Sequence, residues 1–391
     1  MKRILLLLLA LGAVCSLNAK TRKCLYLVTV TGKRAECPVV IRDVPEWAQS
    51  AVVSLGGVHQ IPSQLDRELG ELVFVSTISG SQNFQVTYSS NPDKRVFKDR
   101  VHAQMWLKNP DKTLRAVDSV ASDKNDMYHK LHHHGPAFES EYAAYRIYFD
   151  NKQTIDTYGK KRPQLELAET MWYPSDELLA RGYGHDNLRV FGSVGVGTLK
   201  GWDAEKKKMI HITDFKRREA RILVNGPIRT VVEMRVEGWR YGGREITMTS
   251  RYILYAGHGD VQVENRIEGD FKGLVFTTGV MKMAENKVYK DDNVIAAFGR
   301  DFPENDTVKW ERENVGLAVA VPRKQIASQT DDKTSYLFQL TPDARGRIDY
   351  VFEMIWRKSE WLKDRSDTER VVGLMESVRS AQTPVIVSRM E

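Results

Sequence analysis

Strand-like segments fill most of the second half of this 391-residue sequence. From residue 210 onward, runs rich in β-branched and aromatic residues alternate with short turns such as Asn225-Gly226-Pro227 and Tyr241-Gly242-Gly243. The runs are Ala220–Asn225, Ile228–Trp239, Arg244–Tyr255, Val261–Gly269, Leu274–Met283, Val294–Ala297, Val315–Val321, Thr334–Leu340 and Ile348–Trp356. Long strands joined by short turns predict a mainly β fold, in which antiparallel sheets stack as a β-super-sandwich.

Smaller units are expected at the two ends of the chain. Residues 20–110 contain short alternating runs, which predict a small N-terminal β module that supports the fold or borders a cleft. Residues 94–124 are charged and mixed, as is typical of a connection, so the β-super-sandwich domain is expected over residues 125–391. Residues 361–380 have helical spacing and predict a C-terminal helix.

The first residues are typical of a secretory signal peptide. Lys2 and Arg3 precede an apolar run, Ile4–Val14, and the small residue Ala19 marks a cleavage point. That run is too short for a transmembrane helix, and no later segment is long and apolar enough to span a bilayer. We therefore expect cleavage after Ala19 and a periplasmic or extracellular product.

The charge pattern limits the classes of partner. Loss of Lys2 and Arg3 with the leader lowers the formal net charge from +7 to +5. This mild excess of positive charge suits an acidic substrate. The Lys and Arg residues form no concentrated stripe with interleaved aromatics, which argues against nucleic acid.

Two cysteines, Cys24 and Cys37, follow the leader. In an oxidising compartment they could close a disulfide worth roughly 3 kcal/mol, and two unpaired thiols are the alternative. With so few cysteines, we expect neither a disulfide framework nor a thiolate-bound zinc ion.

Residues 127–160 concentrate the groups that can do chemistry. Four of the nine histidines precede the loop dipeptide Gly135-Pro136, namely His129, His132, His133 and His134. A single run with strand character follows over Glu139–Asp150. Side chains alternate faces along a strand, so Glu139 and Tyr145 are expected on one side, with Arg146 and Tyr148 on the other. Ionisable or phenolic groups on both faces are costly to bury unless paired, and we interpret this stretch as the wall of a functional cleft.

A glycine-rich segment supplies further candidates. Arg181–Asp186 places His185 and Asp186 beside glycines that permit a tight loop tip, and Trp172 and Tyr173 precede it. Residues 192–197 (GSVGVG) and Trp202 continue this region. No clear strand-turn-helix frame surrounds these glycines, so a dinucleotide site is not expected.

Several of these segments resemble known families. Residues 225–229 (NGPIR), Gly238-Trp239 and Ile253–Gly257 are similar to the pattern of galactose-mutarotase-like super-sandwiches. Residues 61–66 (IPSQLD), His134–Lys160 and residues 182–186 (GYGHD) resemble the bacterial family known as domain of unknown function 4861. That family occurs largely in polysaccharide-degrading bacteria, often beside pectin- or uronate-processing enzymes. Its fold relatives include polysaccharide lyases, mutarotases and an oligosaccharide dehydratase. The resemblance implies carbohydrate chemistry and leaves the reaction open.

The candidate residues suit β-elimination from a uronic acid. This reaction needs a group that neutralises the carboxylate, a base for the C5 proton and an acid for the departing oxygen. Arg146 offers a two-pronged partner for a carboxylate, imidazoles titrate in the range of a base, and phenols can serve as the acid. The predicted catalytic residues are His133, His134, Tyr145, Arg146, Tyr148, Tyr173 and His185. The predicted substrate-binding residues are Glu139, Glu141, Tyr158, Lys160, Asp186, Trp172 and Trp202.

Other functions use the same residues. Hydrolysis needs two carboxylates that face each other across the bond, about 5–5.5 Å apart for retention and 6.5–9.5 Å for inversion. Glu139 and Glu141 share one predicted face, so a partner such as Asp176 or Asp186 would have to oppose them. A mutarotase or epimerase would use a histidine and a carboxylate. In a non-catalytic binding protein, tryptophans such as Trp202 would form stacking platforms for sugars.

A metal site is the remaining alternative. His132 and His134 point the same way in an extended chain, and Glu139 could complete a site for zinc or calcium. The elimination itself requires no cofactor. The sequence therefore predicts an exported carbohydrate lyase or dehydratase that acts on acidic oligosaccharides such as pectin fragments.

Overall fold

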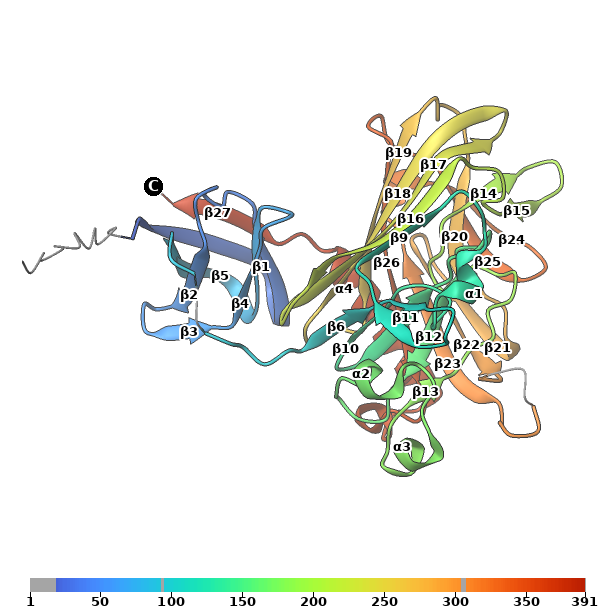
Figure 1. The fold of residues 1–391 in the computed structure, drawn as a ribbon, viewed down its shortest axis with the longest axis horizontal. Helices are drawn as coiled ribbons and strands as arrows, with labels where there is room; N and C mark the ends of the chain where they lie inside the picture. Colours follow the sequence, from blue (N-terminus) through green and yellow to red (C-terminus); the bar gives the residue numbers. More distant parts are fainter. Residues whose placement is uncertain (1–18, 93–94, 304–306, 391) are drawn as a thin grey trace, which may run out of the picture.

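The computed structural model describes residues 19–92, 95–303 and 307–390 (Figure 1). The predicted signal peptide, apart from Ala19, lies outside these described residues. Within the described ranges, no helix is long and apolar enough to cross a membrane.

An antiparallel sheet forms the N-terminal module, on the left of Figure 1. Its two long strands are β1 (Thr21–Ile41) and β5 (Glu71–Ser89), which pair along most of their length with two register shifts. The shorter strands are β2 (Ser50–Leu55), β3 (His59–Ile61) and β4 (Ser63–Asp66). The last strand of the chain, β27 (Ile386–Met390), pairs with the free edge of β1, from Leu25 opposite Met390 to Thr29 opposite Ile386. This module therefore contains both ends of the described chain.

Cys24 and Cys37 are buried free thiols, so of the two alternatives the structure has the unpaired thiols and not the disulfide. Both lie on β1, thirteen residues apart, and not on two strands that turn back on each other. An extended chain rises about 3.3 Å per residue, which separates them far beyond the roughly 7 Å limit for Cα atoms in a disulfide.

One layer of the β-super-sandwich is a large antiparallel sheet. In spatial order its strands are β21 (Ala284–Lys290), β22 (Val294–Asp301), β23 (Glu313–Ala320), β26 (Arg347–Trp356), β19 (Val261–Gly269), β18 (Arg244–Tyr255), β17 (Arg229–Tyr241), β16 (Arg217–Asn225) and β9 (Ser119–Ser122). Each predicted run between residues 220 and 356 lies on a strand of the sandwich, which confirms the mainly β, antiparallel fold. β21 and β24 lie outside those runs.

Two smaller sheets pack against the large one (Figure 1). One orders β13 (His185–Asp186), β12 (Ile155–Gly159), β11 (Ala143–Ile147), β10 (Ala137–Ser140) and β6 (Val101–Gln104). The other orders β15 (Lys208–Ile210), β14 (Lys200–Asp203), β20 (Phe276–Met281), β25 (Ser335–Leu340) and β24 (Ile326–Asp331). The hairpin β7 (Trp106–Lys108) and β8 (Leu114–Ala116) stands apart. Phe138, Tyr145 and Phe338 from the smaller sheets join Met248 and Val263 of the large sheet in one apolar core.

Short helices join the strands, and one longer helix follows them. The short ones are α1 (Met127–Lys130), α2 (Leu167–Thr170), α3 (Asp176–Ala180), and the 3₁₀ turns η1 (Arg323–Gln325) and η2 (Glu360–Leu362). The predicted terminal helix is α4 (Asp367–Gln382), which starts with a capping box between Ser366 and Glu369. Val371, Leu374 and Val378 of α4 pack on the outer face of β22, β23 and β26.

A buried ion pair fixes the N-terminal module to the sandwich. Arg229, whose side chain is 2% exposed, donates to Asp66 at 2.7 Å and to Glu71 at 2.6 Å. The Gln64 side-chain oxygen accepts from the backbone N–H groups of Ile228 and Arg229 at 2.8 and 3.0 Å. Because a buried cation with both partners in place tolerates little displacement, the two parts are held in one orientation at this contact.

The domain limits differ from the predicted ones in two places. The sandwich includes β6, which begins at Val101, so the sandwich starts earlier in the chain than the predicted residue 125. Residues 386–390 belong to the N-terminal sheet as β27, and not to the sandwich.

Candidate functional site

The predicted strand Glu139–Asp150 is a hairpin of β10 and β11, with its turn at Glu141-Tyr142. Glu139 lies opposite Ala144, and Ala137 lies opposite Arg146. Directly paired residues point to the same side of a sheet, so Glu139 shares the face of Arg146. The sequence prediction, which placed Glu139 with Tyr145, is wrong because the chain reverses within the run.

This hairpin gives its small sheet one polar and one apolar face. Arg146 pairs with Asp156 on β12, and Tyr158 pairs with Asp186 on β13, so their side chains share the face of Glu139. The opposite face carries residues such as Phe138, Tyr145 and Ile147, which lie in the core. The polar face is closed at one end by α2 and opens at the other end into a cleft.

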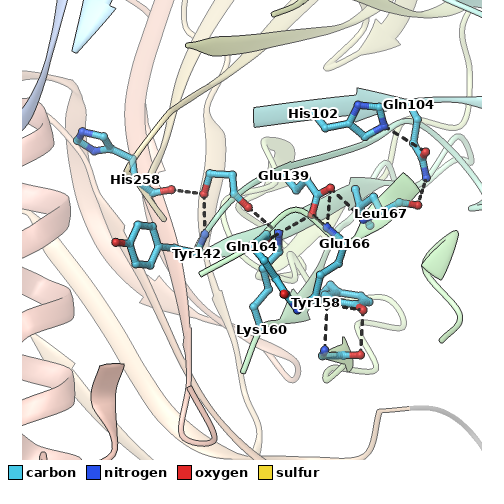
Figure 2. A network of polar contacts seen from close by, with 12 residues as sticks. His102, Gln104, Glu139, Tyr142, Tyr158, Lys160, Gln164, Glu166, Leu167 and His258 are labelled. Atoms are coloured by element: carbon cyan, nitrogen blue, oxygen red, sulfur yellow. Dashed lines mark hydrogen bonds and ion pairs between the residues drawn. The ribbon is translucent and has the colours of Figure 1, made fainter. Parts of the chain in front are cut away.

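At the closed end, Glu139 and Lys160 form a fully buried ion pair (Figure 2). The Lys160 ammonium also donates to the carbonyls of Ser140 and Gln164, at 2.5 and 2.7 Å. The Glu139 carboxylate accepts from the backbone N–H groups of residues 166 and 167 at 2.8–3.0 Å. The pair anchors the start of α2 to β10.

Tyr158 completes this anchor. Its hydroxyl lies 2.8 Å from the Glu166 carboxylate and 2.8 Å from the carbonyl of Gly184, and its side chain is fully buried. Burial and the neighbouring Glu166 raise the pKa of Tyr158. The predicted role of Glu139, Tyr158 and Lys160 in binding substrate does not fit this burial, because their polar atoms are engaged within the protein.

The open end is a cleft of about 560 Å³. Among its lining residues are Tyr128, His134, Arg146, Tyr148, Tyr173 and Asp186. The structure thus brings together four of the predicted catalytic residues and one predicted substrate-binding residue.

Arg146 is the centre of the cleft floor, with its side chain 5% exposed. Its Nε and one terminal nitrogen donate to Asp156 at 3.0 and 2.6 Å. The same terminal nitrogen lies 2.8 Å from Asp186 and 2.7 Å from the Tyr148 hydroxyl, and the other donates to the Tyr173 hydroxyl at 3.0 Å. Burial alone would lower the pKa of Arg146, but the nearby tyrosines and carboxyl groups raise it well above its usual range, so the guanidinium stays charged.

Asp186 is the unusual acid of this cluster. Burial, and then the charge of Asp156, raise its pKa well above the usual range, although Arg146 opposes the shift. Asp186 accepts from the Trp172 indole at 3.0 Å, and the Arg146 guanidinium stacks over that indole at 4.5 Å. Because one cation contacts two carboxyl groups, this arrangement favours a proton on Asp186.

His134 forms the opposite wall with a defined tautomer. Its Nδ1 lies 2.8 Å from the backbone carbonyl of Tyr128, which only accepts, so Nδ1 carries the hydrogen and Nε2 carries the lone pair. The ring stacks on Tyr128 at 4.1 Å. Burial, and to a smaller degree the charge of Arg146, lower the pKa of His134 to about 4. The imidazole is therefore neutral at physiological pH.

Backbone strain gathers around the same cleft. His134 has a φ of +66°, Phe191 of the cleft wall has +42°, and Trp172 beneath Arg146 has +74°. The left-handed region is unfavourable for residues with a Cβ, and it persists where surrounding contacts hold it in place. Such residues are typical of functional sites.

Three predicted catalytic residues lie outside the cleft. Tyr145 is in the core, where its hydroxyl donates to Gly259 and accepts from the backbone of Met354. His133 is fully buried against Gln104 at 3.2 Å, and burial lowers its pKa well below the usual value. His185 was predicted at a loop tip, but it lies on β13, 5% exposed, with its Nδ1 on the Asp186 carbonyl at 2.6 Å.

The other predicted binding residues are also dispersed. Glu141 pairs with Arg100 at 2.5 Å, toward the N-terminal module. Trp202 is buried in a separate apolar cluster. Trp172 is fully buried and reaches the cleft only through its contacts with Arg146 and Asp186.

The tentative metal ligands do not converge. His132 packs against Tyr173, His134 bonds to Tyr128, and Glu139 is bound to Lys160. Across residues 19–92, 95–303 and 307–390, no group of three or more His, Cys, Asp or Glu side chains has a metal-binding arrangement.

Sequence reasoning missed Tyr128, Lys152, Asp156 and Arg189. Tyr128 and Lys152 lie within the stretch 127–160 and line the cleft, as does Arg189. Asp156 stands between Ile155 and Thr157 on β12, and a lone carboxylate in a buried strand was the available signal.

A protein-family model identifies the family to which this chain belongs. The model described as domain of unknown function (DUF4861) matches residues 36–384, which covers most of the chain. The chain belongs to the DUF4861 family. The resemblance inferred from its motifs is therefore confirmed, and the match includes strands of both the N-terminal module and the sandwich.

Solved structures give more distant matches to this DUF4861 protein. A protein in the glycosyl hydrolase family 38 from Enterococcus faecalis is 9% identical, with a TM-score of 0.45 over 94% of this chain and 47% of its own. An alpha-mannosidase from Enterococcus faecalis V583 is 9% identical, with a TM-score of 0.46 over 94% of this chain and 46% of its own. The DUF4861 chain thus spans less than half the length of either protein. No curated protein matches it in sequence.

Proposed function

We propose that this DUF4861 protein is a carbohydrate-active enzyme that performs β-elimination, as a lyase or dehydratase, on uronic-acid-containing oligosaccharides. One observation carries the proposal. A neutral histidine with a free Nε2 lone pair shares a 560 Å³ cleft with a phenol that is held by a buried guanidinium. These are a base and an acid for the two proton transfers of an elimination.

His134 is the proposed base. Its low pKa keeps the imidazole unprotonated, and the hydrogen bond to the Tyr128 carbonyl fixes the lone pair on Nε2. That bond also stabilises the imidazolium that forms when Nε2 takes the C5 proton. The hydrogen bond to the Tyr128 carbonyl and the stacking on the Tyr128 ring hold the imidazole in this orientation.

Tyr173 is the proposed acid. Its oxygen accepts from Arg146, so its own hydrogen is free to point elsewhere, and its side chain is 40% exposed. Burial raises the pKa of Tyr173, although Arg146 opposes this, so the phenol is protonated at neutral pH as an acid must be. The Tyr148 hydroxyl differs, because it donates to Asp156 at 2.7 Å.

Recognition of the substrate carboxylate falls to the cleft walls. The charge of Arg146 is already opposed by Asp156, and its nitrogens also contact Asp186 and the two phenols, so it is not the main partner of a substrate anion. Lys152 and Arg189 line the same cleft and are less buried than Arg146, so they supply the positive charge, although Arg189 also pairs with Asp301. Their attraction to the carboxylate makes the C5 proton more acidic.

The proposed step is balanced without a cofactor. His134 Nε2 takes the C5 proton, the C5–H electrons form the C4–C5 double bond, and the bond from C4 to its oxygen breaks. The departing oxygen takes the Tyr173 proton. Proton exchange with water then restores both residues. Export through the Met1–Ala19 leader to the periplasm or the medium is part of the proposal.

Hydrolysis is the second candidate, because Asp186 has the raised pKa of a general acid. Its position argues against that role. Asp156 and Asp186 contact the same nitrogen of Arg146, so they lie side by side and do not oppose each other across a bond. Asp150 also lines the cleft, but its carboxylate accepts from the backbone N–H groups of Lys152 and Gln153.

A panel of pectic, ulvan-like and glycosaminoglycan oligosaccharides tests the proposal. We expect ultraviolet absorbance from an unsaturated uronate. The signal should be lost in His134→Asn and retained in His59→Asn, a control on the exposed strand β3. New reducing ends without that absorbance would establish hydrolysis, and binding without turnover would establish a carbohydrate-binding protein.

A further inference from the structure

A second cavity, of about 370 Å³, lies where the N-terminal module, the sandwich and α4 meet. Its lining includes Lys33 of β1, Tyr142 of the hairpin turn, His258 and Asp260 of the β18–β19 turn, Glu353 of β26 and Trp361 of η2. Tyr142 is at the end of the hairpin away from Arg146, and Figure 2 shows it near His258. The cavity is therefore separate from the proposed catalytic cleft.

His258 is clamped between two acceptors. Its Nδ1 lies 2.7 Å from the Asp260 carboxylate, and its Nε2 lies 2.7 Å from the carbonyl of Glu36 on β1. Both ring nitrogens must carry hydrogens to satisfy these partners. Burial alone would lower the pKa of His258, but Asp260 and the Glu36 carbonyl raise it to about 9. The imidazolium therefore offsets the Asp260 carboxylate.

Two carboxyl oxygens beside this clamp are buried and have no hydrogen-bond partner among the described residues. They are Asp260 Oδ2 and Glu353 Oε2, on residues that are 4% and 9% exposed. An unsatisfied buried acceptor costs about 1–3 kcal/mol, so proteins rarely keep two together without a use. Both residues border the cavity, so their carboxyl groups can form hydrogen bonds with a ligand there.

The charge of the cavity interior selects the ligand. Burial, and then the charge of Asp260, raise the pKa of Glu353 to about 8, so this group is largely protonated at neutral pH. His258 and Asp260 offset each other, so the remaining charges on the lining are those of Lys33, which is exposed, and Arg34, which donates to the Thr383 carbonyl at 3.0 Å. Among the described residues, no group of three or more His, Cys, Asp or Glu side chains is arranged to bind a metal ion, and these three are no exception. A neutral ligand with hydroxyl groups, which both donate and accept, suits these partners.

An aromatic pair gives the cavity the other feature of a sugar site. Tyr142 and Trp361 are half-buried and meet edge to face, with ring centroids 5.2 Å apart. Exposed faces of such rings pack against the apolar C–H faces of pyranoses. Ser377 and Ser380 of α4 add hydroxyl groups to the wall.

We propose that this cavity is a second saccharide-binding site, which holds a neutral sugar residue between the Tyr142–Trp361 pair and the Asp260 and Glu353 carboxyl groups. The proposal goes beyond the elimination at the cleft and does not depend on it. A sugar bound here would contact the N-terminal module, α4 and the sandwich at once.

The test is binding of neutral oligosaccharides built from galactose, glucose, mannose, rhamnose or arabinose, screened on an array and measured by calorimetry with the full chain. We expect Trp361→Ala and Glu353→Met to weaken binding about tenfold or more, the loss of roughly one good hydrogen bond or stacking contact. Trp47→Ala, a half-buried tryptophan in the N-terminal module, and His134→Asn in the cleft should leave the affinity unchanged.

The Glu353→Met variant distinguishes loss of binding from loss of folding. It replaces an unsatisfied buried acid by an apolar side chain of similar length, so its urea midpoint should equal or exceed that of the wild type. Weaker binding with retained stability supports the site. The proposal is overturned if no neutral saccharide binds, if binding is lost in His134→Asn and kept in Glu353→Met, or if calcium binds in place of sugar.

Discussion

Replacing Arg146 tests the electrostatic account of the cleft most directly. In Arg146→Met, the Asp156 and Asp186 carboxyl groups, 0% and 6% exposed, lose the cation that both of them contact. Removing one partner of a buried ion pair costs about 3–5 kcal/mol, because the remaining charge stays buried without compensation. We expect a decrease of that size in the free energy of unfolding, measured by urea titration with tryptophan fluorescence.

The decrease should depend on pH with a definite sign. Asp186 has a folded-state pKa above its value of about 3.9 in an unfolded chain. Such a group favours the folded state fully below its unfolded pKa, and this contribution is lost as pH rises through the folded pKa. Without Arg146 the folded pKa rises further, so the variant should be closer to wild-type stability at pH 5 than at pH 8.

Two further variants separate this explanation from a packing defect. Arg146→Met combined with Asp156→Asn should recover part of the loss, because a buried carboxylate without a cation is removed. Arg189→Met is the matched control, since Arg189 pairs with Asp301 in the cleft wall but is 23% exposed. Its loss should be about 0–1 kcal/mol. A cost below about 1 kcal/mol for Arg146→Met, or one that is equal at both pH values, would refute the reasoning.

Three other predictions follow from the same contacts. His134→Asn should retain the fold, because asparagine tolerates a positive φ. The rate at which this variant forms unsaturated uronates should fall about 10²–10⁴-fold. An unchanged rate would show that His134 is not the base. Lys160→Met should lower the free energy of unfolding, measured by urea titration, by about 3–5 kcal/mol, because Glu139 stays buried without a cation. The double variant Lys160→Met with Glu139→Gln should recover part of this lost stability. The His258 ring should titrate near pH 9 by nuclear magnetic resonance, and its contribution to stability should be complete below about pH 6.5 and disappear as pH rises through 9. A His258 midpoint near 6.5 would contradict the clamp.

The sequence allowed the sandwich to be predicted because its strands alternate strongly. Arg244–Tyr255 and Val261–Gly269 match β18 and β19 at both ends, since each has a clear period of two and a glycine-containing turn between them. β27 could not be assigned to the N-terminal sheet, because pairing between residues 25 and 390 leaves no local signal.

Only some of the cleft residues could be predicted from the sequence, and the reasons are again physical. Arg146 and Tyr148 were found because polar groups on a strand-like run are costly unless they have a use, and His134 was found because four histidines cluster just before that run. The turn at Glu141-Tyr142 contains no glycine, proline or asparagine, so the hairpin and the true face of Glu139 were missed. His185 lies in a strand because Gly184 lets the backbone approach β12, where an added Cβ would lie 1.7 Å from the Gly159 carbonyl oxygen.

The pairing of β27 with β1 has a consequence for biosynthesis. A ribosome makes β1 long before β27, so the edge of β1 that β27 covers stays open until residues 386–390 have been made. Until then, the growing polypeptide carries an open row of amide and carbonyl groups that can recruit another nascent molecule. Synthesis of β27 would close that row, which makes the pairing of β27 with β1 a late folding step.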